Sequence, residues 1–466
     1  MNKMHMFFCQ RLQHALLALT AFCTSAWGAA AHHCAPTTGP SHWQGVVTHY
    51  GFANRPLGPF APKQQVGVNT IRDEVFWDQV QRADGSFQIP QRIDALVDEA
   101  LRHHITPMLV LGYGHPAHDQ GGKPRSAQAL EGFRRYAIHV AKHFQGRVRH
   151  FEIWNEWDAD TGGAPTGDPD SYLQLIQKVA PALRALDPDL CLVVGALTPA
   201  AQFNGWLNKA LAQGLLKHAD ALSLHTYNYG EGRGKDTPDS WHRDLQWFID
   251  KELPQHPFTR GKSVLVSEMG WANHQTGVSE HLQAAYALRL RLLSLALAHQ
   301  TAQTANPYLG HWWYDWQDDG EDPQEMEHRY GLTRRSGLPK AAWTALKDLE
   351  TLLPTQTAPS RDKAAHIGSE GALTTLTVNR DGPAPHQPTL LAIWHPANEQ
   401  AQVSVLLNDE APRFSAACEA QKMTPQKWRI TASAMPCLIQ LKQPPRGQRP
   451  VWETRMLSMA QPAGLL

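Results

Sequence analysis

Short apolar runs alternate with amphipathic helical stretches between residues 43 and 350, and this alternation restricts the possible fold more than any other feature. Stretches such as 92–104 and 280–300 repeat apolar residues every three or four positions, as helices with one buried face do. Strands that alternate with helices predict βα units and a parallel sheet. The predicted strands are residues 43–51, 66–77, 105–114, 148–158, 191–199, 219–228, 262–270 and 308–316. Eight strands joined by crossover helices close into an α/β fold of the (β/α)8 TIM barrel type.

The chain changes character after residue 355. A chain of 466 residues is too long for one ordinary domain, and residues 355–363, TQTAPSRDK, form a polar linker that contains proline. Beyond it, apolar or alternating runs are bounded by Pro, Gly and Asn, which is typical of antiparallel strands. We therefore predict a barrel at residues 32–354 and a smaller C-terminal antiparallel β-sandwich domain at residues 355–466. Its expected role is support of the barrel, with a separate carbohydrate-binding role as the alternative.

The N-terminus resembles a secretory signal. Lys3 and Arg11 supply positive charge, residues 15–23 are apolar, and residues 26–28 offer small side chains at a cleavage site. A membrane anchor is the alternative, but this apolar stretch is far below the roughly 20 residues needed to span a bilayer. We predict a signal peptide at residues 1–31, a secreted or periplasmic protein, and no stable membrane insertion after the signal is removed.

The charge of the chain is balanced, with 43 basic and 43 acidic residues and a formal net charge of zero. This balance gives no electrostatic case for binding nucleic acid or an acidic membrane surface. There is no Cys-x-x-Cys pair, and the histidines lack the paired spacing of metal ligands. We therefore expect no nucleic-acid partner and no metal, and nothing in the sequence implies a cofactor.

Four cysteines remain once the signal is removed: Cys34, Cys191, Cys418 and Cys437. Cys191 begins an apolar strand and is interpreted as a small buried hydrophobic residue. Cys418 and Cys437 flank a stretch that resembles antiparallel strands, so they are the candidate disulfide of an exported protein.

Two of the predicted strands end in a glutamate. Residues 150–158, HFEIWNEWD, place Glu156 at the end of the fourth strand, and residues 262–273, KSVLVSEMGWAN, place Glu268 at the end of the seventh. The carboxyl ends of parallel strands are where barrels carry out their chemistry. Two carboxyl groups that meet there suit a glycosidase, which needs both at one sugar carbon.

These motifs resemble a known group of enzymes. Asn155-Glu156 is similar to the acid/base strand tip of clan A glycoside hydrolases, and Glu268 followed by Gly270-Trp271 is similar to their nucleophile tip. His225-x-Tyr227 lies between them, as in that clan. Within the clan the sequence resembles glycoside hydrolase family 39, especially bacterial endoglycosidases encoded with exopolysaccharide biosynthesis genes. The resemblance covers residues 43–350.

The resemblance implies a retaining mechanism in which Glu156 is the acid/base and Glu268 the nucleophile. The surroundings must then keep the first carboxyl protonated and the second ionised. Asn155 matches the clan's contact to the sugar 2-hydroxyl group.

The neighbours of the two glutamates are also predicted from strand positions. Arg72, at the tip of the second strand, is the cation expected to keep Glu268 ionised. Tyr227, from the sixth strand, is expected to donate a hydrogen bond to the same carboxylate. His225 either binds sugar hydroxyl groups or holds Glu156 or a loop in place.

Further candidates for substrate binding are aromatic or polar side chains near strand ends: Trp77, Tyr113, His115, Trp157, Trp271, Trp313 and Asp315. The tryptophans are candidate stacking platforms for sugar rings, Trp271 foremost because it lies three residues beyond Glu268. Residues 112–118, GYGHPAH, lack the tryptophan that the family has after this strand, which leaves the substrate specificity open.

Other carboxylates compete for the catalytic roles. Glu152 shares strand parity with Glu156 but lies four residues earlier, about 13 Å deeper at 3.3 Å per residue, so a paired core carboxylate is expected. Asp73 and Glu74 are interpreted as structural ion-pair partners. Asp315 also lies at a strand tip, and we assign it a substrate-binding role.

We therefore predict an exported retaining β-glycosidase that acts within the chain of a bacterial polysaccharide. An exo-acting β-xylosidase-like enzyme is one alternative, since it would use the same catalytic groups. A catalytically silent carbohydrate-binding barrel is the other, although binding alone does not require two glutamates with Asn155 and Arg72.

Overall fold

The computed structural model describes residues 34–36, 42–52, 55–163, 165–228, 236–353, 363–370, 372–380, 389–407 and 412–441. The predicted signal peptide at residues 1–31 lies outside the described residues, and so does the predicted domain boundary at residues 354 and 355.

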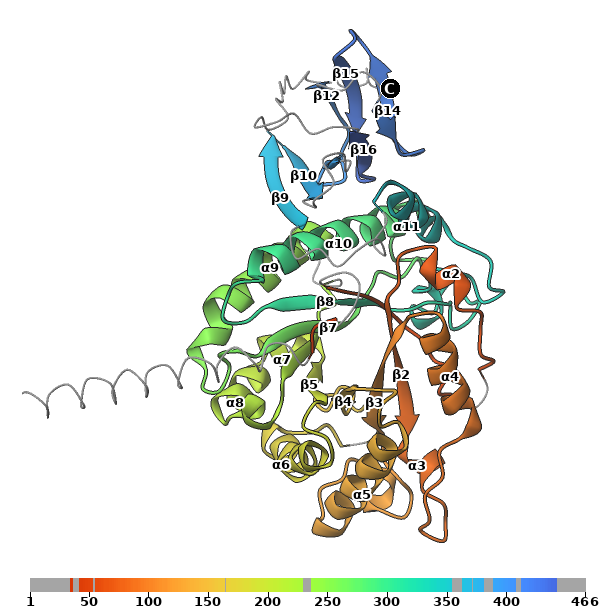
Figure 1. Ribbon diagram of the computed structural model, residues 1–466, viewed down its shortest axis with the longest axis vertical. Helices are drawn as coiled ribbons and strands as arrows, with labels where there is room; N and C mark the ends of the chain where they lie inside the picture. Colours follow the sequence, from red (N-terminus) through yellow and green to blue (C-terminus); the bar gives the residue numbers. More distant parts are fainter. Residues whose placement is uncertain are drawn as a thin grey trace, which may run out of the picture.

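Eight parallel strands form a closed barrel in sequence order, as predicted (Figure 1). The strands are β1 (Trp43–Val47), β2 (Thr70–Phe76), β3 (Thr106–Gly112), β4 (His150–Ile153), β5 (Cys191–Leu197), β6 (Ala221–His225), β7 (Ser263–Met269) and β8 (Tyr308–Trp313). Most are shorter at the carboxyl end than predicted, because the chain turns there into the loops that build the cavity. The ring of strands therefore brings the eight carboxyl ends to one face of the barrel.

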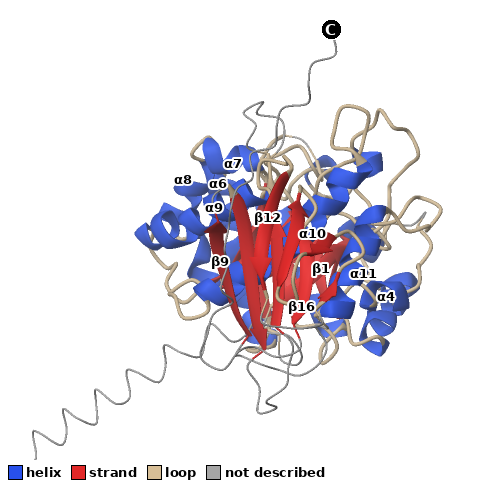
Figure 2. Cartoon of the chain, turned by 90° about the horizontal axis from the view of Figure 1, so that it is seen from above, coloured by secondary structure: helices blue, strands red, loops and turns tan. Residues whose placement is uncertain are grey.

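Helices lie around the barrel strands (Figures 1 and 2). The described α-helices are α2 (Ala61–Gln64), α3 (Trp77–Val80), α4 (Gln91–Arg102), α5 (Ala127–His143), α6 (Pro169–Leu186), α7 (Pro199–Phe203), α8 (Trp206–Ala212), α9 (Pro238–Trp247), α10 (Glu280–Thr301) and α11 (Ala341–Leu352). Both helices predicted from periodicity, α4 and α10, are present. Helix α10 is buried over most of its surface, because it lies between the barrel and the C-terminal domain.

The C-terminal domain is an antiparallel β-sandwich, as predicted. One sheet has the order β13-β16-β11-β10-β9 and the other β12-β15-β14. The strands are β9 (Lys363–Glu370), β10 (Leu373–Arg380), β11 (Thr389–Trp394), β12 (Ala401–Leu406), β13 (Arg413–Phe414), β14 (Glu419–Lys422), β15 (Lys427–Ala432) and β16 (Cys437–Leu441). Figure 1 shows this domain beside α10 and α11, on the outside of the barrel.

A buried ion pair joins the two domains. Arg289 of α10 is fully buried and pairs with Asp239, near the start of α9. The guanidinium also donates to the Asn398 side chain at 2.7 Å and to the Pro396 carbonyl at 2.9 Å. Asp239 in turn accepts from Trp394 Nε1 at 2.9 Å. One carboxylate thus connects α9, α10 and the β-sandwich.

We expect Arg289→Met to lower the free energy of unfolding by on the order of 2–3 kcal/mol, measured by urea titration. This loss is smaller than that for breaking a fully buried ion pair, because Asp239 is partly exposed and keeps its other hydrogen-bond donors. Arg134→Met is the matched control, because Arg134 forms an exposed pair with Glu131 that is worth little. Equal effects of the two changes would show that Arg289 does not tie the domains together.

Two disulfides are present, and one corrects the sequence analysis. The predicted bond between Cys418 and Cys437 is formed. Cys191 was interpreted as a small buried hydrophobic residue; it is buried, but it is also bonded to Cys34 across 157 residues of sequence, a disulfide that was not predicted. Both partners are fully buried, and the bond ties the segment before β1 to the start of β5.

The joint replacement Cys34→Ser/Cys191→Ser should lower the free energy of unfolding by about 2–4 kcal/mol, since the bond closes a long loop in the unfolded chain. Calorimetry of the oxidised proteins measures the change. The bond between Cys418 and Cys437 spans only 19 residues of sequence, so Cys418→Ser/Cys437→Ser should lower the free energy of unfolding by less. A larger loss for Cys418→Ser/Cys437→Ser than for Cys34→Ser/Cys191→Ser would contradict the loop-closure argument.

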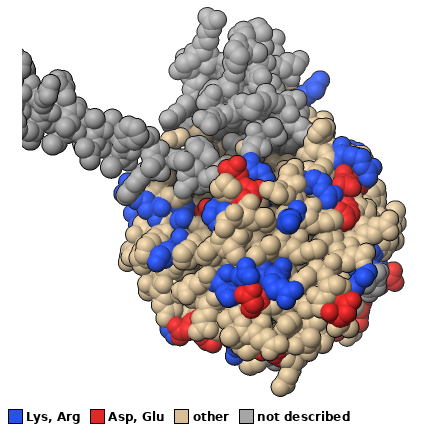
Figure 3. Space-filling view, turned by 60° about the horizontal axis from the view of Figure 1, so that its bottom comes forward, with Lys and Arg blue, Asp and Glu red and all other residues tan. Residues whose placement is uncertain are grey.

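The surface has mixed charge. On the face drawn in Figure 3, basic and acidic side chains are interspersed without a large area of one sign. Within the described residues, every helix is too short or too polar to cross a membrane.

Candidate active site

The two glutamates reach the same cavity by different backbone routes. Glu268 lies within β7, whereas β4 ends at Ile153 and Glu156 follows in a turn. Trp154 and Glu156 have positive φ angles of 70° and 49°, which non-glycine residues adopt rarely and often at functional sites. The turn is held because the Glu156 amide donates to the Ala196 carbonyl at 2.8 Å.

A cavity of about 1280 Å³ opens at the carboxyl ends of the barrel strands. Both glutamates line it, together with Asn155, Tyr113 and Tyr227. Ordinary small-molecule sites have volumes of about 300–1,000 Å³. This cavity is therefore larger than one sugar ring needs.

His225 joins the two carboxylates. Its Nδ1 lies 2.9 Å from Glu156 Oε1 and 3.4 Å from Glu268 Oε2. One carboxylate oxygen of each glutamate lies within 4.8 Å of the other. The imidazole is fully buried, so of the two predicted roles the structure favours holding Glu156 over binding sugar hydroxyl groups.

Arg72 lies beneath the site and is fully buried. It donates to Glu268 Oε1 at 2.6 Å, to Glu152 Oε2 at 2.6 Å and to Asn155 Oδ1 at 2.7 Å. The predicted pairing of Arg72 with Glu268 is confirmed, and Glu152 is a paired core carboxylate as predicted.

Hydroxyl groups complete the shell around the glutamates. Tyr227 Oη donates to Glu268 Oε2 at 3.1 Å, which confirms the predicted contact. Thr161 Oγ1 donates to Glu156 Oε2 at 2.9 Å, a contact that no sequence pattern indicated. Each glutamate thus has a fixed donor and one face toward the cavity.

The pKa values of the two glutamates are shifted in the opposite directions to those expected. Burial disfavours ionisation of Glu156, but the hydrogen bond and charge of His225 outweigh it and lower its pKa. Burial also raises the pKa of Glu268, and the nearby charges of His225 and Arg72 offset this only in part. The pKa of His225 is raised, since the two carboxylates outweigh its burial.

The four predicted stacking tryptophans are buried in packing positions, which corrects the sequence analysis. Trp271 contacts Tyr286 of α10 in an edge-to-face arrangement. None of the four is among the residues that line the cavity, and each is at most 3% exposed: Trp77, Trp157, Trp271 and Trp313. Their indole faces cannot stack on a sugar without rearrangement of the core.

Three other candidates have different positions. Tyr113 lines the cavity, so its predicted contact with a sugar ring stays a prediction. His115 is buried outside the cavity, with Nε2 at 3.1 Å from the Gln81 carbonyl. Asp315 is also buried and is not among the residues that line the cavity, although its neighbours His49 and Tyr314 are. Direct substrate binding by His115 and Asp315 is therefore wrong for this arrangement.

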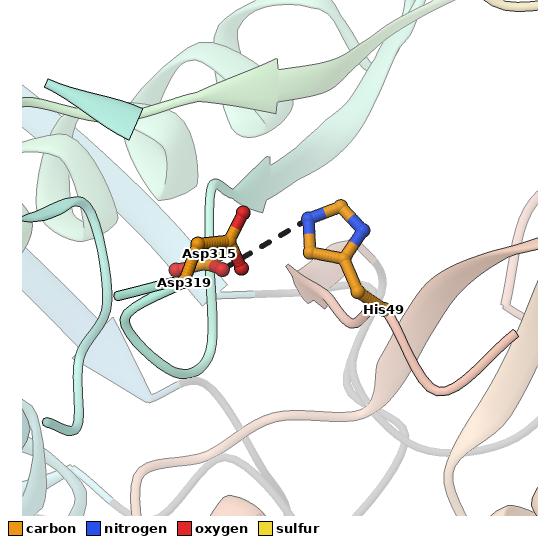
Figure 4. Close-up of side chains that lie close together, drawn as sticks. All are labelled: His49, Asp315 and Asp319. Carbon is orange, nitrogen blue, oxygen red and sulfur yellow. Dashed lines mark ion pairs between the residues drawn. The ribbon is translucent and has the colours of Figure 1, made fainter. Parts of the chain in front are cut away.

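Two groups of side chains bring potential metal ligands within 4.8 Å of one another: Glu156, His225 and Glu268, and His49, Asp315 and Asp319. In the second group (Figure 4), Arg55 already pairs with Asp319. Burial would lower the pKa of His49, but Glu74 and the two aspartates raise it to about 10. His49 lies 3.6 Å from Glu74 and 3.9 Å from Asp315, so the contacts of the second group are those of an ion-pair cluster.

Several residues that line the cavity were not predicted as site residues: His49, Phe52, Glu74, Thr161, Phe203, Trp247, Tyr314, Glu327 and Tyr330. Tyr314 directly follows β8 and could have been found from its position after the strand. Phe203 and Trp247 lie at the ends of helices, where the strand-tip rule gives no signal.

A closed parallel barrel with two glutamates in one cavity defines a clan A glycoside hydrolase. The family model described as cellulase (glycosyl hydrolase family 5) matches residues 34–320, which is more than half of the chain. The chain belongs to this family of retaining glycoside hydrolases and resembles family 39 in structure. No curated protein matches the sequence.

Solved structures show the same fold. A family 39 glycoside hydrolase from Bacteroides cellulosilyticus WH2 has 22% sequence identity and a TM-score of 0.68, with 85% of this chain and 80% of that chain covered. A monomeric beta-xylosidase from Caulobacter crescentus CB15 has 17% identity and a TM-score of 0.55, with 88% and 98% covered. The family 39 enzyme from Xanthomonas axonopodis pv. citri has the same identity and TM-score, with 88% and 96% covered.

Proposed function

We propose that the protein is an endo-acting β-glycosidase that hydrolyses a bacterial exopolysaccharide by double displacement. Glu268 is the nucleophile and Glu156 the acid/base. The observation that carries this assignment is the pair of carboxylate oxygens within 4.8 Å in one large cavity. This short spacing suits direct attack by one carboxylate, whereas an inverting pair is about 6.5–9.5 Å apart to leave room for water.

In the first step Glu268 attacks the anomeric carbon while Glu156 protonates the departing oxygen. In the second step Glu156 takes a proton from water, which attacks the same carbon and releases Glu268. Arg72 and Tyr227 stabilise the Glu268 carboxylate as it forms again.

The first step needs the proton on Glu156. His225 Nδ1 lies at hydrogen-bond distance from Glu156 Oε1, and its pKa is raised. Transfer of that proton along the hydrogen bond converts the pair to neutral histidine and carboxylic acid. His225 also lies 3.4 Å from Glu268, so the charge of either carboxylate affects the proton on His225.

The size of the cavity favours endo action over removal of single terminal sugars, because it continues well past the glutamates. An exo-acting β-xylosidase-like enzyme is the second candidate, supported by the beta-xylosidase fold neighbour from Caulobacter crescentus. A silent binding barrel is disfavoured, since binding does not require the Arg72, His225 and Glu156 arrangement.

We also propose export, on the signal-like residues 1–31 and the two disulfides. Fractionation of producing cells tests this, with the mature protein expected outside the cytoplasm. Accumulation of full-length protein in the cytoplasm would oppose it.

The function is tested with the purified protein on a panel of β-linked polysaccharides, including the matrix polysaccharide of the producing bacterium. Release of an oligosaccharide ladder supports endo action, and early release of monosaccharide supports the exo candidate. NMR of the first product should show retained anomeric configuration, and inverted product would remove Glu268 as the nucleophile.

A further inference from the structure

The cavity continues past Glu156 over helices that follow β5 and β6. Its wall there includes Thr198, Gln202 and Phe203 around α7, and Trp241 and Trp247 of α9. This extension lies outside the ring of barrel strands that holds the two glutamates.

Exposed aromatic side chains are concentrated in this cavity. Among the described residues, the phenylalanines and tryptophans that are strongly exposed are Phe52, Phe203, Trp247 and Phe258. Three of these four line the cavity, and Phe203 and Trp247 are 79% and 57% exposed. Apolar surface left open in a groove marks a binding site for a ligand that covers it. The flat faces of such rings suit the apolar faces of sugar rings.

The backbone beneath Phe203 is fixed to the catalytic side of the barrel. Gln202 Nε2 donates to the His225 carbonyl at 3.0 Å. The Thr198 amide, just before α7, donates to Asp158 Oδ1 at 3.1 Å. The turn that presents Phe203 is therefore positioned before substrate arrives, which reduces the ordering cost of binding.

The backbone near Trp247 is held in a similar way. Trp241, six residues earlier in α9, donates from Nε1 to Thr226 Oγ1 at 2.7 Å. Directly after Trp247 the helix continues as a π-helical turn, Phe248–Glu252, a form that recurs at functional sites. Phe248 and Glu252 both line the cavity from this turn.

The positions of β4 and β7 divide the barrel ring into two arcs. The arc of β8, β1, β2 and β3 carries the polar residues His49 and Glu74, with Arg72 beneath. The polar side chains of this arc can hydrogen-bond the hydroxyl groups of the one sugar whose anomeric carbon is attacked. The arc of β5 and β6 leads to Phe203 and Trp247 and is adjacent to β4, which carries the proton donor.

We propose that Phe203 and Trp247 form a stacking platform for the leaving-group part of a polysaccharide chain. This inference rests on the proposed function and deepens it, because it assigns the sugars beyond the cleaved bond to the β5–β6 side of the cavity. A neutral β-linked chain with exposed apolar ring faces is the ligand that two flat, uncharged rings recognise.

The test uses Phe203→Ala, Trp247→Ala and the double variant, with Phe258→Ala as control. Phe258 is 54% exposed and does not line the cavity. The substrates are the polysaccharide that the wild-type enzyme cleaves in the panel, its octasaccharide labelled at the reducing end with 2-aminobenzamide, and the glycosyl fluoride of its sugar. Fluoride is too small to reach the platform.

We expect kcat/KM on the octasaccharide to fall about tenfold for each ring removed, an effect of the size of one buried aromatic contact. The glycosyl fluoride should be hydrolysed as by the wild type, and the labelled fragments should shift to shorter lengths. Phe258→Ala should leave the hydrolysis rates of both substrates unchanged.

Three results would overturn the platform: an unchanged octasaccharide rate, equal losses on octasaccharide and fluoride, or a shift of the labelled fragments to longer lengths. Acrylamide quenching of Trp247 provides an independent check in the Glu268→Gln protein, with Trp247→Phe as reference. Bound octasaccharide should reduce the quenching of Trp247 fluorescence by acrylamide. Failure of the proposed function is seen separately, as wild-type protein that cleaves no polysaccharide.

Discussion

Glu156→Gln is expected to lower kcat about 10²–10⁴-fold on substrates with a sugar leaving group, the range for loss of a general acid–base group. Added azide should partly restore turnover of an activated aryl glycoside, because azide attacks the glycosyl-enzyme without a base. The product should be a glycosyl azide of retained configuration. Steady-state kinetics and NMR of the azide product measure both effects.

Glu268→Gln should abolish turnover of all substrates, since no covalent intermediate forms. Azide can then attack the substrate directly and gives the inverted glycosyl azide. Circular dichroism should show native folding in both variants, because both side chains line a cavity. Glu325→Gln, an exposed glutamate at the surface, is the matched control and should keep full activity. Retained azide product from the Glu268 variant would require exchange of the two roles.

The barrel and its catalytic strand tips were predictable because both depend on local patterns. The positions near strand ends placed Glu268 and Tyr227 together without knowledge of contacts. The motif around Glu156 was found in the same way, although its side chain depends on a turn with positive φ angles. Such a turn has no periodic signal, so the orientation of the Glu156 side chain could not be predicted from the sequence. Arg72 was expected at the tip of the second strand, which is wrong, because it is the third of the seven residues of β2 and reaches Glu268 from within the barrel.

The aromatic residues were not predictable, because a short distance from a strand tip does not say which way a side chain turns. Trp271 follows β7 closely, but its ring packs toward α10 and Gln283 donates to its carbonyl at 2.8 Å. Phe203 and Trp247 reach the cavity from helices whose placement depends on packing over the whole barrel. The bond between Cys34 and Cys191 likewise joins positions 157 residues apart, beyond any local pattern.

Arg72→Met should cause the largest combined loss of stability and activity. Removal of the guanidinium leaves Glu152 buried without its cation, and breaking such a pair costs about 3–5 kcal/mol of unfolding free energy. The pKa of Glu268, already raised by burial, should rise further because a nearby positive charge is lost. The acidic limb of the kcat/KM profile therefore moves to higher pH, with a plateau about 10²–10³-fold lower. Urea titration and the pH profile measure the two effects.

The double variant Arg72→Met/Glu152→Gln separates these two effects. Glu152 contacts Arg72 from below and does not line the cavity, so its neutralisation removes the uncompensated charge without touching Glu268. A large part of the lost stability should return, while the acidic limb stays displaced and the plateau stays low. Recovery of activity along with stability would mean that Arg72 acts only through folding. An unmoved limb with a raised KM would instead mean that Arg72 acts through sugar binding and that His225 and Tyr227 suffice to keep Glu268 ionised.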